Sequence, residues 1–210
     1  MKHPLARITT AFATIFATWS LTHCAFAQDA IPFDEAQRIA QKLASTPSAS
    51  SDQPFTVEAD ADKPVGLKGG DAGVIILPDK RLTVETFAHA TKTITPVAQL
   101  WSYKVNLTSN GKSVESGKLR VITVSDGDKS RDVQLFLIGV AKNEQGALEL
   151  VVFGKGSDPI LRAPLAKLHE TKQDFPIEVS GRKTGDDSAA LTLDLVGGYT
   201  ADLAVVKAGD

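Results

Sequence analysis

The chain contains 210 residues and carries a formal net charge of −2, with 23 Lys and Arg residues against 25 Asp and Glu residues. A mildly acidic chain without a basic cluster gives no support for nucleic-acid binding, which needs a cationic stripe facing the phosphates. Cysteine and methionine occur once each, so a disulfide within the chain and a thiolate metal cluster are both excluded.

Residues 1–27 have the three parts of a secretory signal peptide. Two basic residues open the segment, residues 8–21 carry no charge, and a small-x-small pattern ends at Ala27. A membrane anchor is the alternative, but a spanning helix needs about 20 apolar residues, and this run is shorter and interrupted by Thr and Ser. The sequence predicts cleavage after Ala27, a mature chain that starts at Gln28 without a membrane span, and a periplasmic or secreted location.

Cys24 offers a second interpretation of the same segment, because a lipid-modified cysteine would hold the protein at a membrane. The preceding Leu21 suits a bacterial lipoprotein box, whereas His23 stands where that box needs a small residue. Removal of Cys24 with the signal leaves a chain without cysteine, which favours a bacterial envelope protein over a eukaryotic extracellular one.

Residues 28–44 form the next segment, in which apolar side chains recur with helical spacing from residue 32 and charges match the helix dipole. Residues 45–54 are small and polar with two prolines and are typical of a flexible linker. We therefore expect a helix that is either tethered to, or docked on, a β-rich domain over residues 55–210.

From residue 55 the pattern changes to short strands separated by turns. The expected strands are 55–61, 73–77, 98–108, 118–125, 132–141, 148–153, 159–168, 175–183, 189–196 and 199–206. The Gly-rich stretch 66–73 is expected to be a turn, and residues 84–91 a short helix with Thr83 as its N-cap. Asn110-Gly111 and Asp126-Gly127-Asp128 mark hairpins.

The fold class follows from these elements. About eight to ten strands with regular turn signals favour an all-β protein with an antiparallel β-sandwich or barrel-like core and one short helix. Residues 133–140 and 148–153 are apolar on both faces, so these strands are expected to lie centrally. Alternation over residues 98–108 places Trp101, Tyr103 and Leu107 on one face of a half-buried strand.

Few residues point to chemistry. Trp101 and Tyr103 would form a stacking platform for a glycan if exposed, although their apolar face favours burial in the core. Alternating oxygen ligands at Asp126, Asp128, Ser130 and Asp132 are suited to calcium, but the pattern fails as an EF-hand loop and favours a solvated hairpin tip.

His89 and His169 lack the close spacing of metal ligands, and no nucleophile or nucleotide-binding motif occurs. No cofactor is therefore predicted, with calcium as the weak exception. The sequence favours a non-enzymatic β-sandwich module of the cell envelope that binds or scaffolds a protein or glycan partner. A secreted hydrolase of polysaccharide or cell-wall material, with an acid–base pair of distant carboxylates, is the alternative, and a protein that pairs through an open sheet edge is a third.

Overall fold

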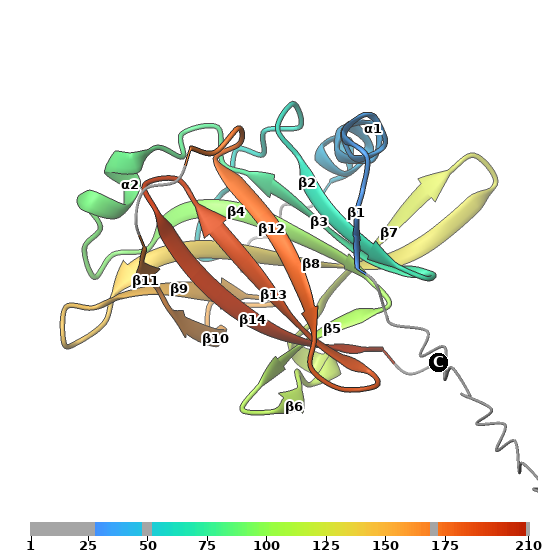
Figure 1. Cartoon of the computed structure of the whole chain (residues 1–210). Coiled ribbons are helices and arrows are strands. Elements are labelled where there is room, and N and C mark those ends of the chain that lie inside the picture. Colours follow the sequence, from blue (N-terminus) through green and yellow to red (C-terminus); the bar gives the residue numbers. More distant parts are fainter. Residues whose placement is uncertain (1–27, 48–51, 169–171, 209–210) are drawn as a thin grey trace, which may run out of the picture.

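Two antiparallel sheets pack face to face in the computed structural model, which describes residues 28–47, 52–168 and 172–208 (Figure 1). The first sheet has the strand order β1-β2-β3-β4-β8-β9-β10, with β7 paired to β8. Its strands are β1 Asp29–Ala30, β2 Val65–Gly69, β3 Ala72–Pro78, β4 Thr95–Tyr103, β7 Arg120–Asp126, β8 Lys129–Lys142, β9 Leu148–Phe153 and β10 Pro159–Pro164.

The second sheet has the order β12-β13-β14-β5-β6, with β11 paired to β14. Its strands are β5 Val105–Ser109, β6 Lys112–Ser113, β11 Ala166–Lys167, β12 Ile177–Lys183, β13 Ser188–Leu195 and β14 Tyr199–Lys207. The helical elements are α1 Phe33–Ser45, α2 Val84–Ala88 and a 3-10 turn at Ser116–Lys118. The prediction of an all-β antiparallel sandwich is confirmed.

The core has two layers because the first sheet is covered on both faces. One apolar cluster lies between the sheets, with Leu100 and Phe136 from the first sheet against Leu193 and Leu203 from the second. The other cluster lies on the outer face of the first sheet, under α1 and the segment that follows it. The predicted central segments are therefore buried on both sides over Leu135–Ala141 of β8 and Leu150–Phe153 of β9, where the sequences are apolar on both faces.

Helix α1 packs on the first sheet and is part of the fold rather than a tethered appendage. Ala36, Ala40 and Leu43 are buried along one side of the helix, and Ala40 and Leu43 contact the outer cluster that contains Trp101. This is the apolar stripe that the helical spacing predicts, and the sheet supplies the surface against which it is buried.

The segment at residues 55–61, predicted as a strand, crosses the outer face of the sheet with a single bridge between Ala59 and Asp79. Asp79 fastens it, because its buried carboxylate accepts hydrogen bonds from the backbone N–H groups of Glu58 and Arg81 and pairs with the Arg81 side chain. Burial raises the pKa of Asp79, but these hydrogen bonds outweigh burial and hold the pKa below its usual value.

The predicted single strand 98–108 is wrong, because the chain changes sheets in its middle. Lys104 has a positive φ of 55°, which ends β4 at Tyr103 and directs β5 into the second sheet beside β14. Trp101 consequently lies in the outer cluster, while Leu107 lies between the sheets. A residue in the left-handed region breaks the two-residue alternation on which the predicted common face depended.

The Gly-rich stretch also differs from its prediction as a turn, since Val65–Gly69 forms β2 and pairs with β3. Gly66 allows this close pairing, because a Cβ atom there would lie 2.8 Å from the Val74 carbonyl oxygen. Both predicted hairpins form, and α2 begins after Thr83 with reciprocal hydrogen bonds to Thr86 that form a capping box.

Candidate functional site

A groove of about 690 Å³ lies on the outer face of the first sheet, between α1 and the hairpin formed by β7 and the start of β8. Figure 1 shows this hairpin extending beyond the rest of the sheet on the side of α1. We call it the lateral groove. Its apolar lining comes from both walls and from the sheet between them: Ile31, Ile39, Leu43, Val74, Ile75, Trp101, Val124 and Val133.

Charged side chains surround this apolar lining. The cations are Arg38, Lys42, Lys68 and Arg131, and the anions are Glu35 and Asp71. Lys68 neutralises Glu35 across the gap between β2 and α1, with 3.1 Å between Nζ and Oε2. Lys104 pairs with Asp71 in the turn between β2 and β3. Both carboxylates are therefore engaged, and the groove retains an excess of positive charge.

The two arginines carry this excess. Neither Arg38 nor Arg131 forms an ion pair with a carboxylate within the described part of the chain. Arg38 projects from α1 and Arg131 from β8, so the two stand on opposite walls of the same groove. A guanidinium group recognises carboxylate and phosphate groups through two parallel hydrogen bonds, so this arrangement is suited to an anionic ligand.

Tyr103 positions one of these arginines. The Arg131 guanidinium carbon lies 5.6 Å from the centre of the Tyr103 ring, and Lys104 Nζ lies 5.8 Å from the same ring. Such cation–π contacts hold the charged groups beside the ring without neutralising them. The ring therefore holds cations in place at the end of β4 rather than presenting free faces for stacking.

Trp101 and Tyr103 do not meet the condition of exposure under which they would form a stacking platform. Trp101 is 2% exposed and donates a hydrogen bond from Nε1 to Gln99 Oε1 at 3.0 Å, in agreement with the interpretation of a core residue. Tyr103 is half-buried. Sugar stacking by this pair would need two exposed rings on one face, whereas Trp101 contributes only an edge of the lining of the lateral groove.

The predicted calcium ligands lie along the β7–β8 hairpin, and two of them contact other side chains of the hairpin. Asp132 accepts a hydrogen bond from Thr123 Oγ1 at 2.7 Å, and the Ser130 and Ser125 hydroxyls are 3.3 Å apart. Asp128 is exposed in the turn, and Asp126 ends β7. The hairpin prediction holds, and within the described residues no three His, Cys, Asp or Glu side chains are placed to hold a metal ion.

His89 caps the C-terminal end of α2 and is exposed, whereas His169 lies outside the described residues. The same is true of Cys24 and of the predicted cleavage position Ala27. Among the helices that the structure describes, none has the length and apolar character needed to cross a membrane.

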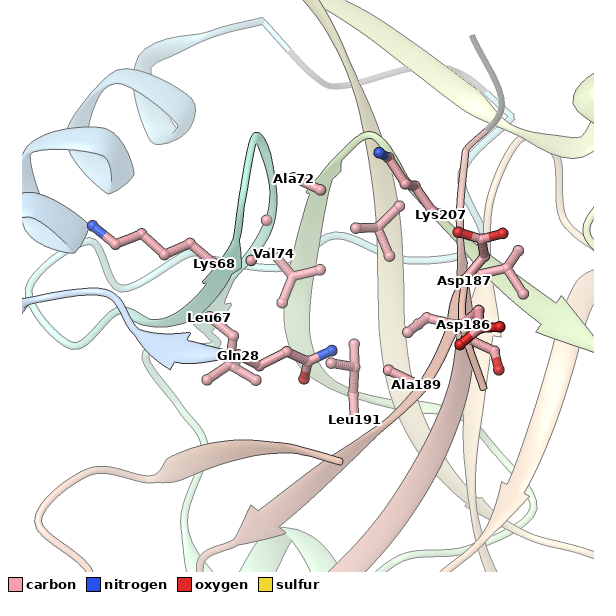
Figure 2. A pocket seen from close by; sticks show the side chains of 16 residues that line it. Gln28, Leu67, Lys68, Ala72, Val74, Asp186, Asp187, Ala189, Leu191 and Lys207 are labelled. Carbon is pink, nitrogen blue, oxygen red and sulfur yellow. The ribbon is translucent and has the colours of Figure 1, made fainter. Parts of the chain in front are cut away.

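A second cavity lies between the edges of the two sheets, shown in Figure 2, and holds only about 50 Å³. The Gln28 side chain lies in it between Leu67 and Leu191, with Oε1 buried and unpartnered among the described residues. Gly181 permits this position, because a Cβ atom there would overlap the Gln28 carboxamide. The space admits water but not an organic ligand, which usually needs at least about 300 Å³.

The lateral groove depends on residues that the sequence did not single out. Arg38 and Lys42 are four residues apart and so fall on one side of α1, but an exposed cationic pair is common on helices. Arg131 lies in a segment whose sequence indicates a hairpin tip or calcium ligands rather than an anion site. Comparison of this chain with protein families, with curated proteins and with solved structures gives no match.

Proposed function

We propose that this protein is an exported, non-enzymatic binding module of the cell envelope that captures an anionic ligand or partner in the lateral groove. The observation that carries the proposal is the pair of arginines, Arg38 and Arg131, on opposite walls of an apolar groove of about 690 Å³. Ligand sites usually combine this range of volume with an apolar lining and a few charged groups that fix orientation.

The carboxylates of the groove favour binding over the hydrolase alternative. A general acid needs a pKa raised towards neutrality. The hydrogen bond from Lys104 instead lowers the pKa of Asp71, which keeps this carboxylate ionised and engaged. Glu35 forms an ion pair with Lys68. These contacts support a groove that recognises charge rather than one that transfers a proton.

Trp101 allows a direct test, because it is the only tryptophan after residue 27 and lines the groove. We suggest titrating the chain from Gln28 onward with three anionic probes, namely dodecanoate, oligogalacturonate and an acidic peptide, while following tryptophan fluorescence. At least one probe should change the emission. The double variant Arg38→Glu/Arg131→Glu should weaken that binding by about tenfold or more, since two attractive charges become repulsive.

The matched control is Arg182→Glu/Lys112→Glu, which makes the same charge change on exposed residues of the second sheet. It should bind the probe as tightly as the unchanged protein. If both double variants weaken probe binding equally, the net charge of the protein explains the loss, and the proposal fails. It would also fail if none of the three probes altered Trp101 emission.

Export has its own test, which is the mass and N-terminal sequence of the protein recovered from a bacterial envelope. Cleavage after Ala27 gives Gln28 as the first residue. A chain that begins at Cys24 with the added mass of lipid would replace that proposal with membrane attachment, and an uncleaved chain would contradict both.

A further inference from the structure

Strand β8 has a free edge beside the lateral groove. Its pairing with β4 stops at Gln134, opposite Ser102, although β8 continues back to Lys129 in its hairpin with β7. Strand β4 does not continue beside the first residues of β8, because the positive φ of Lys104 takes the chain into the second sheet directly after Tyr103. Within the described residues, no strand occupies the line of β4 beyond that point.

The register identifies the backbone groups on this free edge. Residues that flank a two-residue hairpin turn form a hydrogen-bonded pair, and such pairs alternate along the ladder. Asp126 and Lys129 are that pair, so Lys129, Arg131 and Val133 bond to β7. The N–H and C=O groups of Ser130 and Asp132 therefore point away from β7, towards the empty line of β4.

One side-chain acceptor atom at the start of the free edge also lacks a partner among the described residues. The Gln134 side chain donates a hydrogen bond to Asn106 Oδ1, but its Oε1 atom is buried and has no hydrogen-bond partner among the described residues. A buried acceptor without a donor costs free energy. A donor carried by an incoming strand on the face of Ser130 and Asp132 would satisfy it.

A second copy of the same edge is a poor occupant. Antiparallel pairing of two such edges places Arg131 opposite Arg131 in one register, and Lys129 opposite Arg131 or Asp132 opposite Asp132 in the neighbouring ones. Like charges directly opposite each other destabilise a sheet. The side chains of β8 that face the groove instead match a strand that carries acidic residues.

We infer that the lateral groove binds an extended acidic polypeptide segment as an added strand, with its backbone paired to Ser130 and Asp132 and its acidic side chains between Arg131 and Arg38. This inference rests on the proposed function and names the partner class of the same site. Strand addition takes affinity from main-chain hydrogen bonds and specificity from alternate side chains. One face of the added strand meets the cations of the groove. Its other face meets the hydroxyl-rich face of the hairpin.

The probe is the capped peptide acetyl-Thr-Glu-Thr-Val-Thr-Glu-Thr-amide, which puts Glu, Val and Glu on the groove side. Binding is measured by Trp101 fluorescence with the chain from Gln28 onward. We expect saturable binding, and a loss of about tenfold or more when lysine replaces both glutamates. N-methylation of the threonines, which would pair with Ser130 and Asp132, should abolish binding because it removes the backbone donors.

Two proline variants separate the two edges of the hairpin. Ser130→Pro removes the N–H group on the free edge of β8, whereas Ser125→Pro removes one on the opposite edge of β7, and both delete the same Ser125–Ser130 hydroxyl contact. Ser130→Pro should reduce peptide binding by about tenfold or more. Ser125→Pro should leave it unchanged, and circular dichroism establishes that both variants are folded.

The outcomes distinguish this inference from the proposed function. Peptide binding that survives both N-methylation and Ser130→Pro would overturn strand addition while the groove remained a binding site. If dodecanoate or oligogalacturonate binds and the peptide does not, the inference of a polypeptide partner is wrong, while the proposed binding function stands. Failure of every probe to reach the groove would overturn both.

Discussion

The two halves of β8 have opposite environments within one continuous strand. From Leu135 to Ala141 every residue is buried, with β4 on one side as far as Val140 and β9 on the other from Leu137 onward. From Lys129 to Asp132 every residue is exposed, and among the described strands only β7 pairs with this half. Since both halves have the same backbone conformation, the difference lies in what covers them.

One half of β8 stabilises the sheet, and the other half is the one that we propose binds a partner. The buried half is sandwiched between two apolar clusters that anchor the sheet. The exposed half is held in an extended form by β7, so its backbone groups stay aligned without a second neighbour. In our proposal, an edge that β7 already holds extended accepts a strand without first becoming ordered, which lowers the entropic cost of binding.

The largest expected effect lies in the buried half. Phe136→Ala should lower the free energy of unfolding by about 3–5 kcal/mol, because Phe136 is fully buried between the sheets. Lys129→Ala in the exposed half should change it by no more than about 0.5 kcal/mol. Urea unfolding monitored by circular dichroism measures both, and similar losses would show that the hairpin is part of the core.

A smaller loss of unfolding free energy is expected when the segment at residues 55–61, which packs on the buried half of β8, is less firmly held. Asp79→Asn replaces a buried carboxylate that accepts hydrogen bonds from Arg81 and Glu58, at a cost of about 1.5–3 kcal/mol near neutral pH.

The same carboxylate fixes the pH dependence. Because the pKa of Asp79 is lowered in the folded state, its stabilisation is present above the unfolded value of about 3.9 and is lost as the pH falls through the folded value. Unfolding curves of the unchanged protein and Asp79→Asn should therefore converge in acid. If the difference in unfolding free energy between the two proteins is the same at all pH values, packing rather than the charge of Asp79 holds the segment at residues 55–61.

The junction that leaves the edge free should tolerate glycine but not a β-branched residue. Lys104→Val forces a β-branched side chain into the left-handed region, at a cost of about 1–2 kcal/mol. Lys104→Gly removes the same ion pair with Asp71 without that strain and should be nearly neutral. Thermal unfolding of the two variants compares them directly, and equal destabilisation would assign the effect to the ion pair.

The smallest effect is local and involves no loss of stability. The amides of Ser130 and Asp132 should exchange with solvent faster than those of Arg131 and Val133, because only the latter pair with β7. Two-dimensional NMR resolves these residues individually. Uniform protection along the hairpin would contradict the free edge, and the acidic peptide should slow exchange at Ser130 and Asp132.

Much of the fold was accessible from local patterns. Asn110-Gly111 predicts its hairpin because both residues adopt positive φ there. Consecutive apolar residues such as Leu150–Phe153 predict a central strand, here β9, since they suit a strand buried on both faces. The change of sheet at Lys104 was not predictable, because lysine carries no preference for the left-handed region and alternation continues through it in the sequence.

The candidate site was largely hidden for a related reason. Arg38 and Arg131 each look like ordinary surface cations, and only the packing of α1 beside the β7–β8 hairpin brings them to one groove. Tyr103 was noticed for stacking, but its role beside Arg131 depends on where β4 ends. Pairing between distant segments has no signature in either segment alone.

By itself, the sequence determined the antiparallel class, the hairpin turns, the central strands and the apolar face of α1, because these depend on side-chain period and backbone preference within a few residues. It also predicts export through residues 1–27. Only the tertiary structure decided that α1 docks, that one strand becomes β4 and β5, and that β8 keeps a free edge beside two arginines. Those features arise from contacts between distant segments, whose free energy exists only once the sheets have assembled.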